Sequence, residues 1–335
     1  MHTLRLAIFG QFFEIRCSDS NTIEKLRLDF YHFITDKTFF HENISILIQP
    51  PPWHLIPAIR SLKQNESSII YEKDGIRFND YHGKALSIVD YNKNESHIYT
   101  TDHNLAHELG YLLILSRSGK KMDLAGFHKI HAMGIQYKTN NLIFISPSKG
   151  GKSTHFLKLL EDPEIKIFSD DTPIVDRKGN IYSFPLRVGI EHEKNLPSYV
   201  NQEEVYKLER RIYGTKTLIP LKAIKRELAI YNNKQKIVLV VGIRTRAKSS
   251  KIVRVSSLSL VPYLFKFLII GVGLPMILEY FLESGFLDLL KRVKIILSRS
   301  CAMASLLIKS DAYIVELNEN IEQNTNLLRS LIKNN

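Results

Sequence analysis

The chain has 335 residues, enough for one large domain or two ordinary ones, and its 44% hydrophobic and 24% charged residues are typical of a folded globular protein. A formal net charge of +12 favours anionic partners such as nucleotides, acidic peptides, nucleic acid or phospholipid headgroups, although lysines scattered by a compositional bias would give the same charge. The two cysteines, Cys17 and Cys301, lie far apart in no metal-ligand spacing. This argues against a disulfide framework or a zinc site and favours a cytoplasmic location.

Two apolar stretches raise the question of membrane targeting. The first, within residues 4–17, has no long hydrophobic core followed by a small-residue cleavage site, so we expect a β-strand and no signal peptide. The second, 258–278, is long enough to span a bilayer but is interrupted by Lys266, two prolines and two glycines. We expect buried or interfacial helices there, and not an integral membrane protein.

The first hundred residues alternate short β-like runs with turns that contain Asp-Gly, His-Gly and Asn. This pattern predicts an antiparallel, β-rich N-terminal region. The predicted strands cover 4–17, 44–49, 68–78, 85–91 and 97–101.

A helix is predicted over 102–118, with Asp102 as its N-cap. His103 and His107 lie one turn apart on this helix, a spacing that can chelate zinc. No acidic or third ligand follows in a matching register. We therefore expect both histidines to face solvent.

Between residues 128 and 190 the pattern becomes strand, glycine-rich loop, helix and strand, which predicts a βαβ unit with a right-handed crossover. Another strand, 236–246, precedes a basic connector and a helix-rich region with a polar tail. The expected fold is α/β, with a β-rich N-terminal region at 1–101, a core at 102–255 and a helical C-terminal region at 256–335.

The sequence IFISPSKGGKST, residues 143–154, contains the last three fixed positions of the phosphate-binding pattern G-x-x-x-x-G-K-[ST]. Ser146 stands where that pattern has its first glycine. An apolar strand at 142–145 precedes the loop and a helix follows it, and this context would aim helix N-terminal amides at phosphates. The alternative is a lysine-bearing turn in which Ser153 only caps the helix.

Each loop residue has a physical role if the loop binds a nucleotide. Gly150 and Gly151 let backbone N–H groups turn inward, and Lys152 offers an ammonium group to the β- and γ-phosphates. Ser153 can place its hydroxyl on Mg²⁺, with Thr154 as the second hydroxyl. The residues expected to contact the nucleotide are Ser148, Lys149, Gly150, Gly151, Lys152, Ser153 and Thr154.

The next predicted strand, IKIFSDD, delivers Asp170 and Asp171 at its carboxyl end, where α/β proteins place ligands. One carboxylate could hold Mg²⁺ while the other accepts a proton from an attacking hydroxyl. Like-charge proximity would raise the pKa of one of them, which suits proton transfer near neutrality. The alternative is a solvated Asp-Asp turn.

Three motifs together resemble the HPr kinase/phosphorylase superfamily, whose fold is related to phosphoenolpyruvate carboxykinase, and in particular its peptide-serine kinase branch. The motifs are IHAMGI, SPSKGGKST and FSDD. His131 lies fifteen residues before Ser146, a spacing similar to that in the family. The resemblance spans about 102–192, includes the helix ahead of His131, and extends more loosely to the first strand.

The resemblance implies a mixed sheet with a P-loop and ATP/Mg²⁺-dependent transfer of the γ-phosphate to a serine-like hydroxyl. Lys152 and the loop amides would bind the ATP phosphates, and Ser153 with Asp171 or Asp170 would position Mg²⁺. Asp170 would deprotonate the acceptor hydroxyl, and His131 would assist the charge on the phosphoryl group. Alternatively, His131 is a neutral core histidine that satisfies a carbonyl.

The loop departs from the family pattern, because Ser146 and Lys149 replace glycines and Pro147 stiffens the backbone. Nucleotide affinity or geometry is therefore expected to differ. The glycine-rich signature through which HPr kinases handle HPr is also missing. A peptide, such as a ribosomal peptide precursor, or a small hydroxyl compound is the expected acceptor.

Basic residues outside the loop are candidates for contacts to the phosphate or the acceptor. They are Arg187 and, in the basic stretch 242–254, Arg244 and Arg246. The alternative for this stretch is a solvated basic hairpin, and its lack of interleaved aromatics argues against nucleic acid. The C-terminal region could supply an acceptor pocket or a homo-oligomer contact. The alternative function is a nucleotide-binding regulatory protein without phosphoryl transfer.

Overall fold

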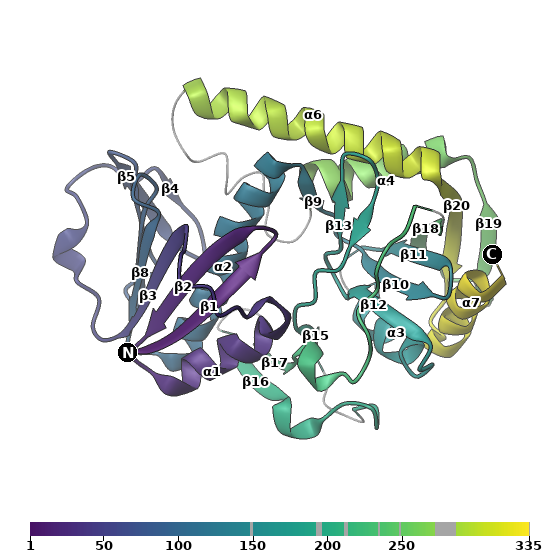
Figure 1. The fold of residues 1–335 in the computed structure, drawn as a ribbon, viewed down its shortest axis with the longest axis horizontal. Helices are drawn as coiled ribbons and strands as arrows, with labels where there is room; N and C mark the ends of the chain where they lie inside the picture. Colours follow the sequence, from purple (N-terminus) through teal and green to yellow (C-terminus); the bar gives the residue numbers. More distant parts are fainter. Residues whose placement is uncertain are drawn as a thin grey trace. The chain divides into compact units, whose positions relative to one another are not determined.

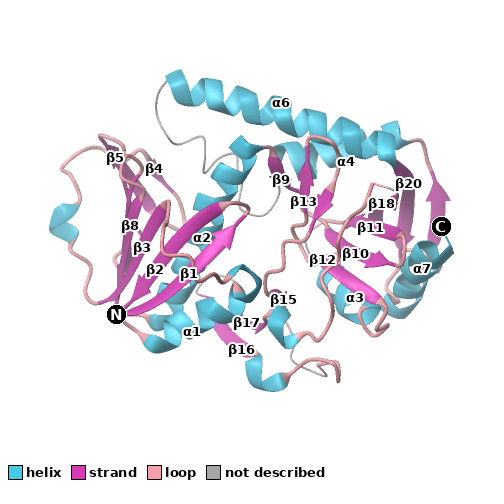
Figure 2. Ribbon diagram, viewed as in Figure 1, coloured by secondary structure: helices cyan, strands magenta, loops and turns pink. Residues whose placement is uncertain are grey.

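The computed structural model describes residues 1–147, 150–191, 196–210, 214–233, 235–247, 249–271 and 286–334. These residues form a mixed α/β protein with several sheets and helices (Figures 1 and 2). The chain divides into two compact units, Met1–Lys121 and Met122–Asn335, and the boundary falls inside helix α2 (His103–Ala125).

The N-terminal unit contains an eight-stranded sheet in the order β1-β2-β3-β8-β7-β6-β5-β4. Strand β3 pairs parallel with both β2 and β8, and the other neighbouring pairs are antiparallel. The strands are β1 (His2–Ile8), β2 (Gln11–Cys17), β3 (Glu42–Ile48), β4 (Lys63–Gln64), β5 (Ile69–Lys73), β6 (Ile76–Asp80), β7 (Ala85–Asp90) and β8 (Glu95–Thr100).

Helices α1 (Ser20–Asp29) and α2 cover one face of this sheet. Gly110 permits the close approach of α2, because a Cβ there would lie 2.7 Å from Ile46 Cδ1 and 3.4 Å from Leu26 Cδ1. Asp102 Oδ1 accepts from the backbone N–H groups of Asn104 and Leu105 at 2.9 and 3.1 Å, so the predicted N-cap is confirmed.

The prediction that both histidines of α2 face solvent is wrong for His107. Its side chain is fully buried, and its Nε2 lies 2.9 Å from Oδ2 of the buried Asp29. His103 is exposed and pairs with Asp19 at 3.3 Å. The contact pairs His107 Nε2 with the Asp29 carboxylate inside the protein, so these two residues belong to the core of the N-terminal unit.

The second unit is built on a six-stranded sheet in the order β12-β10-β11-β18-β20-β19. Strands β11, β12, β18 and β20 run in one direction, whereas β10 and β19 run in the other. The strands are β10 (Met133–Tyr137), β11 (Asn140–Ile145), β12 (Ile165–Ser169), β18 (Lys236–Arg244), β19 (Lys251–Arg254) and β20 (Ser310–Leu317).

Alternate residues of the central strands form two separate apolar layers. Phe144 and Val240 face the helices α3 (Lys152–Leu159) and α7 (Ile321–Asn334). Ile143 and Leu239 face α4 (Val261–Leu264), α6 (Phe286–Lys309) and the π-helical turn η6 (Phe265–Ile270). Figure 2 shows this sheet between its helices. Burial on both faces explains why β11 and β18 are almost continuously apolar.

Two small sheets complete this unit, in the orders β14-β13-β9 and β15-β17-β16. Their strands are β9 (Phe127–Lys129), β13 (Ile174–Asp176), β14 (Ile181–Tyr182), β15 (Val188–Ile190), β16 (Tyr206–Arg210) and β17 (Gly214–Ile219). Single 3₁₀ turns lie at Tyr31–Phe33, Trp53–Leu55, Gln202–Glu204, Leu221–Ala223 and Ser257–Leu260.

The structure differs from the expected fold in the C-terminal region and the basic stretch. The region 256–335, expected to be helical, contributes β20 to the middle of the sheet. Strand β19 pairs with β20 and not with β18, so the basic stretch is not a hairpin. The arginine at its end, Arg254, forms an ion pair with Asp311 at 2.5 Å.

The apolar segment 258–278 is described only as far as Gly271. There it forms short helical turns with Leu260, Leu264 and Phe267 buried in the core. Across the described ranges, no helix combines the length and the apolar character that crossing a membrane requires.

Close packing around Gly242 in β18 gives a test of the fold. A Cβ at this position would lie 2.7 Å from Phe144 Cζ and 2.9 Å from Leu317 Cδ1. We therefore expect Gly242→Ala to lower the free energy of unfolding by about 1–3 kcal/mol through overpacking. Ile308→Ala, at a side chain that is 85% exposed, is the control and should change it by less than about 0.5 kcal/mol in urea denaturation.

Candidate functional site

Three chain segments that are distant in sequence meet at one edge of the six-stranded sheet. The loop after β11 and the two aspartates after β12 leave the carboxyl ends of parallel strands. Strand β10 runs between them in the opposite direction, and its first residue, Met133, pairs with Phe144 near the end of β11. His131, just before β10, therefore reaches the same edge.

The loop between β11 and α3 depends on its two glycines. Gly150 N donates to Pro147 O at 2.9 Å, and a Cβ on Gly150 would lie 2.6 Å from that oxygen and 2.7 Å from Ser146 Oγ. Gly151 is the N-cap of α3 and has φ +83°, a conformation that favours glycine. Ser148 and Lys149, both predicted nucleotide contacts, lie outside the described residues.

Lys152 is the first residue of α3 and lies at the centre of the site, 8% exposed. Its Nζ lies 2.6 Å from His131 Nε2, 3.3 Å from Ser146 O and 3.4 Å from Asp171 Oδ1. His131 Nδ1 lies 3.2 Å from the same Asp171 oxygen. An ammonium group can only donate, so His131 Nε2 accepts and Nδ1–H faces Asp171.

His131 lies in a bend between β9 and β10. Its backbone N–H donates to Phe267 O at 3.0 Å. Its ring stacks on the Phe267 ring with centroids 5.9 Å apart and an interplanar angle of 14°. The imidazole is thus held by the π-helical turn on one side and by Lys152 and Asp171 on the other.

Among the described residues, two buried oxygen atoms at this edge have no hydrogen-bond partner. Ser153 Oγ donates to Asp170 Oδ2 at 2.8 Å, which leaves Asp170 Oδ1 unpaired in a residue only 6% exposed. Ser146 is completely buried, and its Oγ has no partner in the part of the chain that the structure describes. Each unmet polar atom costs about 1–3 kcal/mol in the folded protein, and a ligand bound at this helix N-terminus could satisfy both.

The two adjacent aspartates have pKa values displaced in opposite directions. Burial, and then the neighbouring charge of Asp171, raise the pKa of Asp170 to about 7, although Ser153 and Lys152 oppose the rise. Burial also acts to raise the pKa of Asp171, but His131 and Lys152 outweigh it and hold that pKa below its usual value. One carboxyl can therefore exchange a proton near neutral pH while the other stays ionised.

Lys216 in β17 belongs to this site, although no sequence pattern marked it. Its positive charge is close enough to lower the pKa of Asp170, which opposes the effects of burial and of Asp171. Its Nζ lies 3.1 Å from the position that a Cβ on Gly189 would occupy. The small sheet β15-β17-β16 thus places a third basic group near the aspartates, and only the pairing of its strands reveals this.

His155 was also missed, and it lies one turn along α3 from Lys152. Its Nδ1 lies 2.9 Å from Oγ1 of Thr325 in α7, and Thr325 Oγ1 donates to Ile321 O at 2.8 Å. His155 Nδ1 therefore carries the hydrogen, and Nε2, near Gly151, is the acceptor. Burial, and then the charges of Lys158 and Arg244, lower the pKa of His155 to about 4.

The remaining predicted contacts are less closely tied to the loop. Arg244 ends β18 and acts on His155 through its charge. Arg187 Nη1 donates to the Tyr206 hydroxyl at 3.2 Å. Thr154 and Arg246 are exposed, and in the described parts of the chain neither is hydrogen-bonded to the site.

A pH titration of stability tests the environment of His155. An unfolded histidine takes up a proton near pH 6.5, but the folded one does so only near pH 4. The unfolded state then binds more protons in this window, so wild-type stability should fall by roughly 3 kcal/mol between pH 6.5 and 4 because of this residue. His155→Gln should remove this part of the loss in urea denaturation, and exposed His54→Gln is the control. An unchanged pH dependence in His155→Gln would contradict the assignment.

No protein-family model matches the chain, and no curated protein matches it significantly.

Proposed function

We propose that this protein is an ATP- and Mg²⁺-dependent kinase that transfers the γ-phosphate to a serine-like hydroxyl. One observation carries the proposal: Lys152, Ser153, Asp170, Asp171 and His131 converge at a glycine loop and helix N-terminus, beside two buried oxygens that no described residue hydrogen-bonds. This set combines a phosphate-binding cation, oxygen ligands and a carboxyl poised to accept a proton.

The distribution of charge supports an anionic ligand in the second unit. Lys and Arg balance Asp and Glu at 14 each in Met1–Lys121, whereas Met122–Asn335 has 32 basic and 20 acidic residues. The whole net charge of +12 therefore belongs to the unit that contains the site. Helix α3 adds a positive N-terminal dipole, which favours phosphate beside Gly151 and Lys152.

The residues present also fit Mg²⁺, which prefers oxygen ligands and keeps several waters. In the described residues, no cluster of three or more His, Cys, Asp or Glu side chains forms a cage that could hold a metal alone. Ser153 Oγ with oxygens of Asp171 or Asp170 would hold the ion together with the substrate phosphates. When bound, Mg²⁺ would neutralise charge on the phosphates.

The two aspartates would have different roles because their pKa values are shifted in opposite directions. Ionised Asp170 would take the proton from the acceptor hydroxyl, whose oxygen then bonds to the γ-phosphorus while the bond to the β-phosphate oxygen breaks and ADP leaves. Asp171 stays ionised and orients His131 and Lys152. The cations would stabilise the negative charge that develops on the transferred group.

The acceptor class follows from the sequence resemblance, and its expected forms are a serine of a peptide, such as a ribosomal peptide precursor, or a small hydroxyl compound. The exposed thiol of Cys301 suits a reducing compartment, so we place the protein in the cytoplasm.

Substitutions at the loop and at the base should separate binding from transfer. We expect Asp170→Asn to retain ATP binding but to reduce phosphoryl transfer by about 10²-fold or more, because the base is lost. Lys152→Met should weaken ATP binding and also reduce phosphoryl transfer. Binding is measured by calorimetry with ATP and Mg²⁺, and transfer by hydrolysis of γ-labelled ATP and by mass spectrometry of peptides encoded by neighbouring genes.

The matched control is Lys158→Met, which removes a partly exposed lysine from the same helix. It should leave both measurements within about twofold of the wild type. ATP binding with neither hydrolysis nor transfer to any acceptor would reject the kinase and favour a nucleotide-binding regulatory protein.

The pH dependence of the reaction gives a second test. Because only ionised Asp170 accepts a proton, kcat/KM should rise about tenfold per pH unit below about pH 7 and level off above it. The rise should be absent from the residual activity of Asp170→Asn. A flat profile between pH 5.5 and 8 in the wild type would contradict the role of Asp170 as the base.

A further inference from the structure

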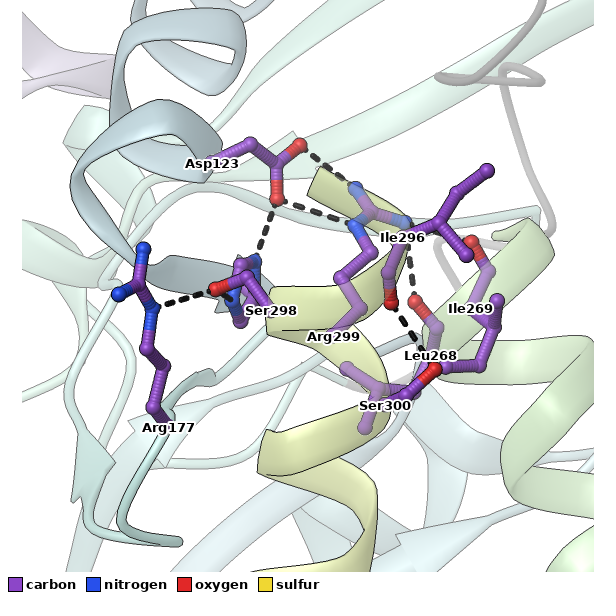
Figure 3. A network of polar contacts seen from close by, with 9 residues as sticks. Asp123, Arg177, Leu268, Ile269, Ile296, Ser298, Arg299 and Ser300 are labelled. Atoms are coloured by element: carbon purple, nitrogen blue, oxygen red, sulfur yellow. Dashed lines mark hydrogen bonds and ion pairs between the residues drawn. The ribbon is translucent and has the colours of Figure 1, made fainter. Parts of the chain in front are cut away.

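A buried polar network lies on the face of the sheet covered by α6 (Figure 3). At its centre, Arg299 is 1% exposed and donates to both carboxylate oxygens of Asp123, at 3.0 and 2.6 Å. Its Nη1 donates to Leu268 O and Ile269 O, both at 2.9 Å. One guanidinium thus joins the C-terminal part of α2 to the π-helical turn η6.

The rest of the network fixes Asp123. His128 Nδ1 lies 2.7 Å from Asp123 Oδ1, and His128 Nε2 lies 2.7 Å from Ser298 Oγ, which also accepts from Arg177 Nε at 2.7 Å. The order Ser298, His128 and Asp123 resembles a hydrolase triad, but these residues are only 5%, 0% and 2% exposed. Access for a substrate is closed, so the network is structural.

The carbonyls that Arg299 binds are those that the end of a helix leaves without partners. Turn η6 ends at Ile270, and the next residue, Gly271, has φ +79° and donates its backbone N–H to Lys266 O at 3.1 Å. A π-helical turn is intrinsically unfavourable and needs outside contacts to persist. Arg299 supplies them from a neighbouring helix.

The same turn holds His131. The carbonyl that accepts from His131 N and the ring that stacks on its imidazole both belong to Phe267, one residue before the first carbonyl held by Arg299. On its other side the imidazole meets Lys152 and Asp171. A continuous path of direct contacts therefore joins Asp123, through Arg299 and η6, to the candidate site.

We propose that Arg299 is a positioning residue that fixes η6, and through Phe267 the imidazole of His131, against Lys152. The consequence for catalysis rests on the proposed kinase function. The consequence for the His131 ring does not, because it concerns the ligand-free protein alone. A displaced imidazole would slow phosphoryl transfer but leave the loop amides that bind phosphate in place.

The test uses the full chain with Arg299→Lys, which keeps a positive charge beside Asp123 but cannot make all four hydrogen bonds. A second variant, Phe267→Leu, removes the ring that stacks on His131 and leaves the buried ion pair intact. The matched control is Lys294→Arg, a charge-conserving change at an exposed lysine of the same helix. Thermal unfolding followed by circular dichroism establishes that each variant folds.

We expect Arg299→Lys and Phe267→Leu to lower kcat for ATP hydrolysis by about tenfold or more while the Kd for ATP changes by less than about threefold. In the ligand-free protein, both should shift the ring-nitrogen NMR signals of His131, assigned with a His131→Gln sample. Lys294→Arg should change neither the kcat nor the His131 signals.

Unchanged His131 signals in a folded Arg299→Lys protein would overturn the proposal, and so would equal losses of ATP binding and turnover. If the wild type transfers no phosphate at all, the kinase function fails, yet shifted His131 signals in both variants would still support the positioning role.

Discussion

The insertion of one antiparallel strand between two parallel ones is the constraint on which the candidate site depends. Strand β10 separates β11 from β12, so the start of one strand is brought level with the ends of the other two. His131, the glycine loop and Asp170-Asp171 would otherwise lie at different places in the sheet. Burial on both faces of the sheet fixes this register, because a slip of one residue would exchange the two apolar layers.

The site residues that the sequence predicted are those with local signals. Strand β11, the glycine pair, helix α3 and the aspartates after β12 follow one another between residues 140 and 171, and turn chemistry and periodicity specify each of them. Lys152, Ser153, Asp170 and Asp171 were predicted for this reason, and the structure brings them together at one edge of the sheet. Phe267 and Lys216 were missed because their place depends on η6 and on the pairing of β15 with β17, which join distant segments.

The errors in the predicted fold have the same origin. Strand β20 begins at Ser310, immediately after α6 ends at Lys309. Because no turn residues separate the two elements, the sequence pattern predicts one continuous helix there. His107 looked exposed because its partner, Asp29, lies 78 residues earlier in the chain. Local patterns specify elements, whereas long-range pairing decides which polar side chains are buried.

The loop also shows how a departure from a common pattern can be accommodated. Ser146 replaces the first glycine of the phosphate-binding pattern, and its Oγ occupies the space that a Cβ on Gly150 would need. Because the Ser146 side chain fills this space, position 150 has to be a glycine. The two positions are therefore coupled. The serine hydroxyl is buried, has no hydrogen-bond partner among the described residues, and belongs to a residue whose carbonyl accepts from Lys152 Nζ. The serine therefore adds a polar group to the candidate site. A hydroxyl in this place can hydrogen-bond to a phosphate oxygen, which the first glycine of the pattern could do only through its backbone.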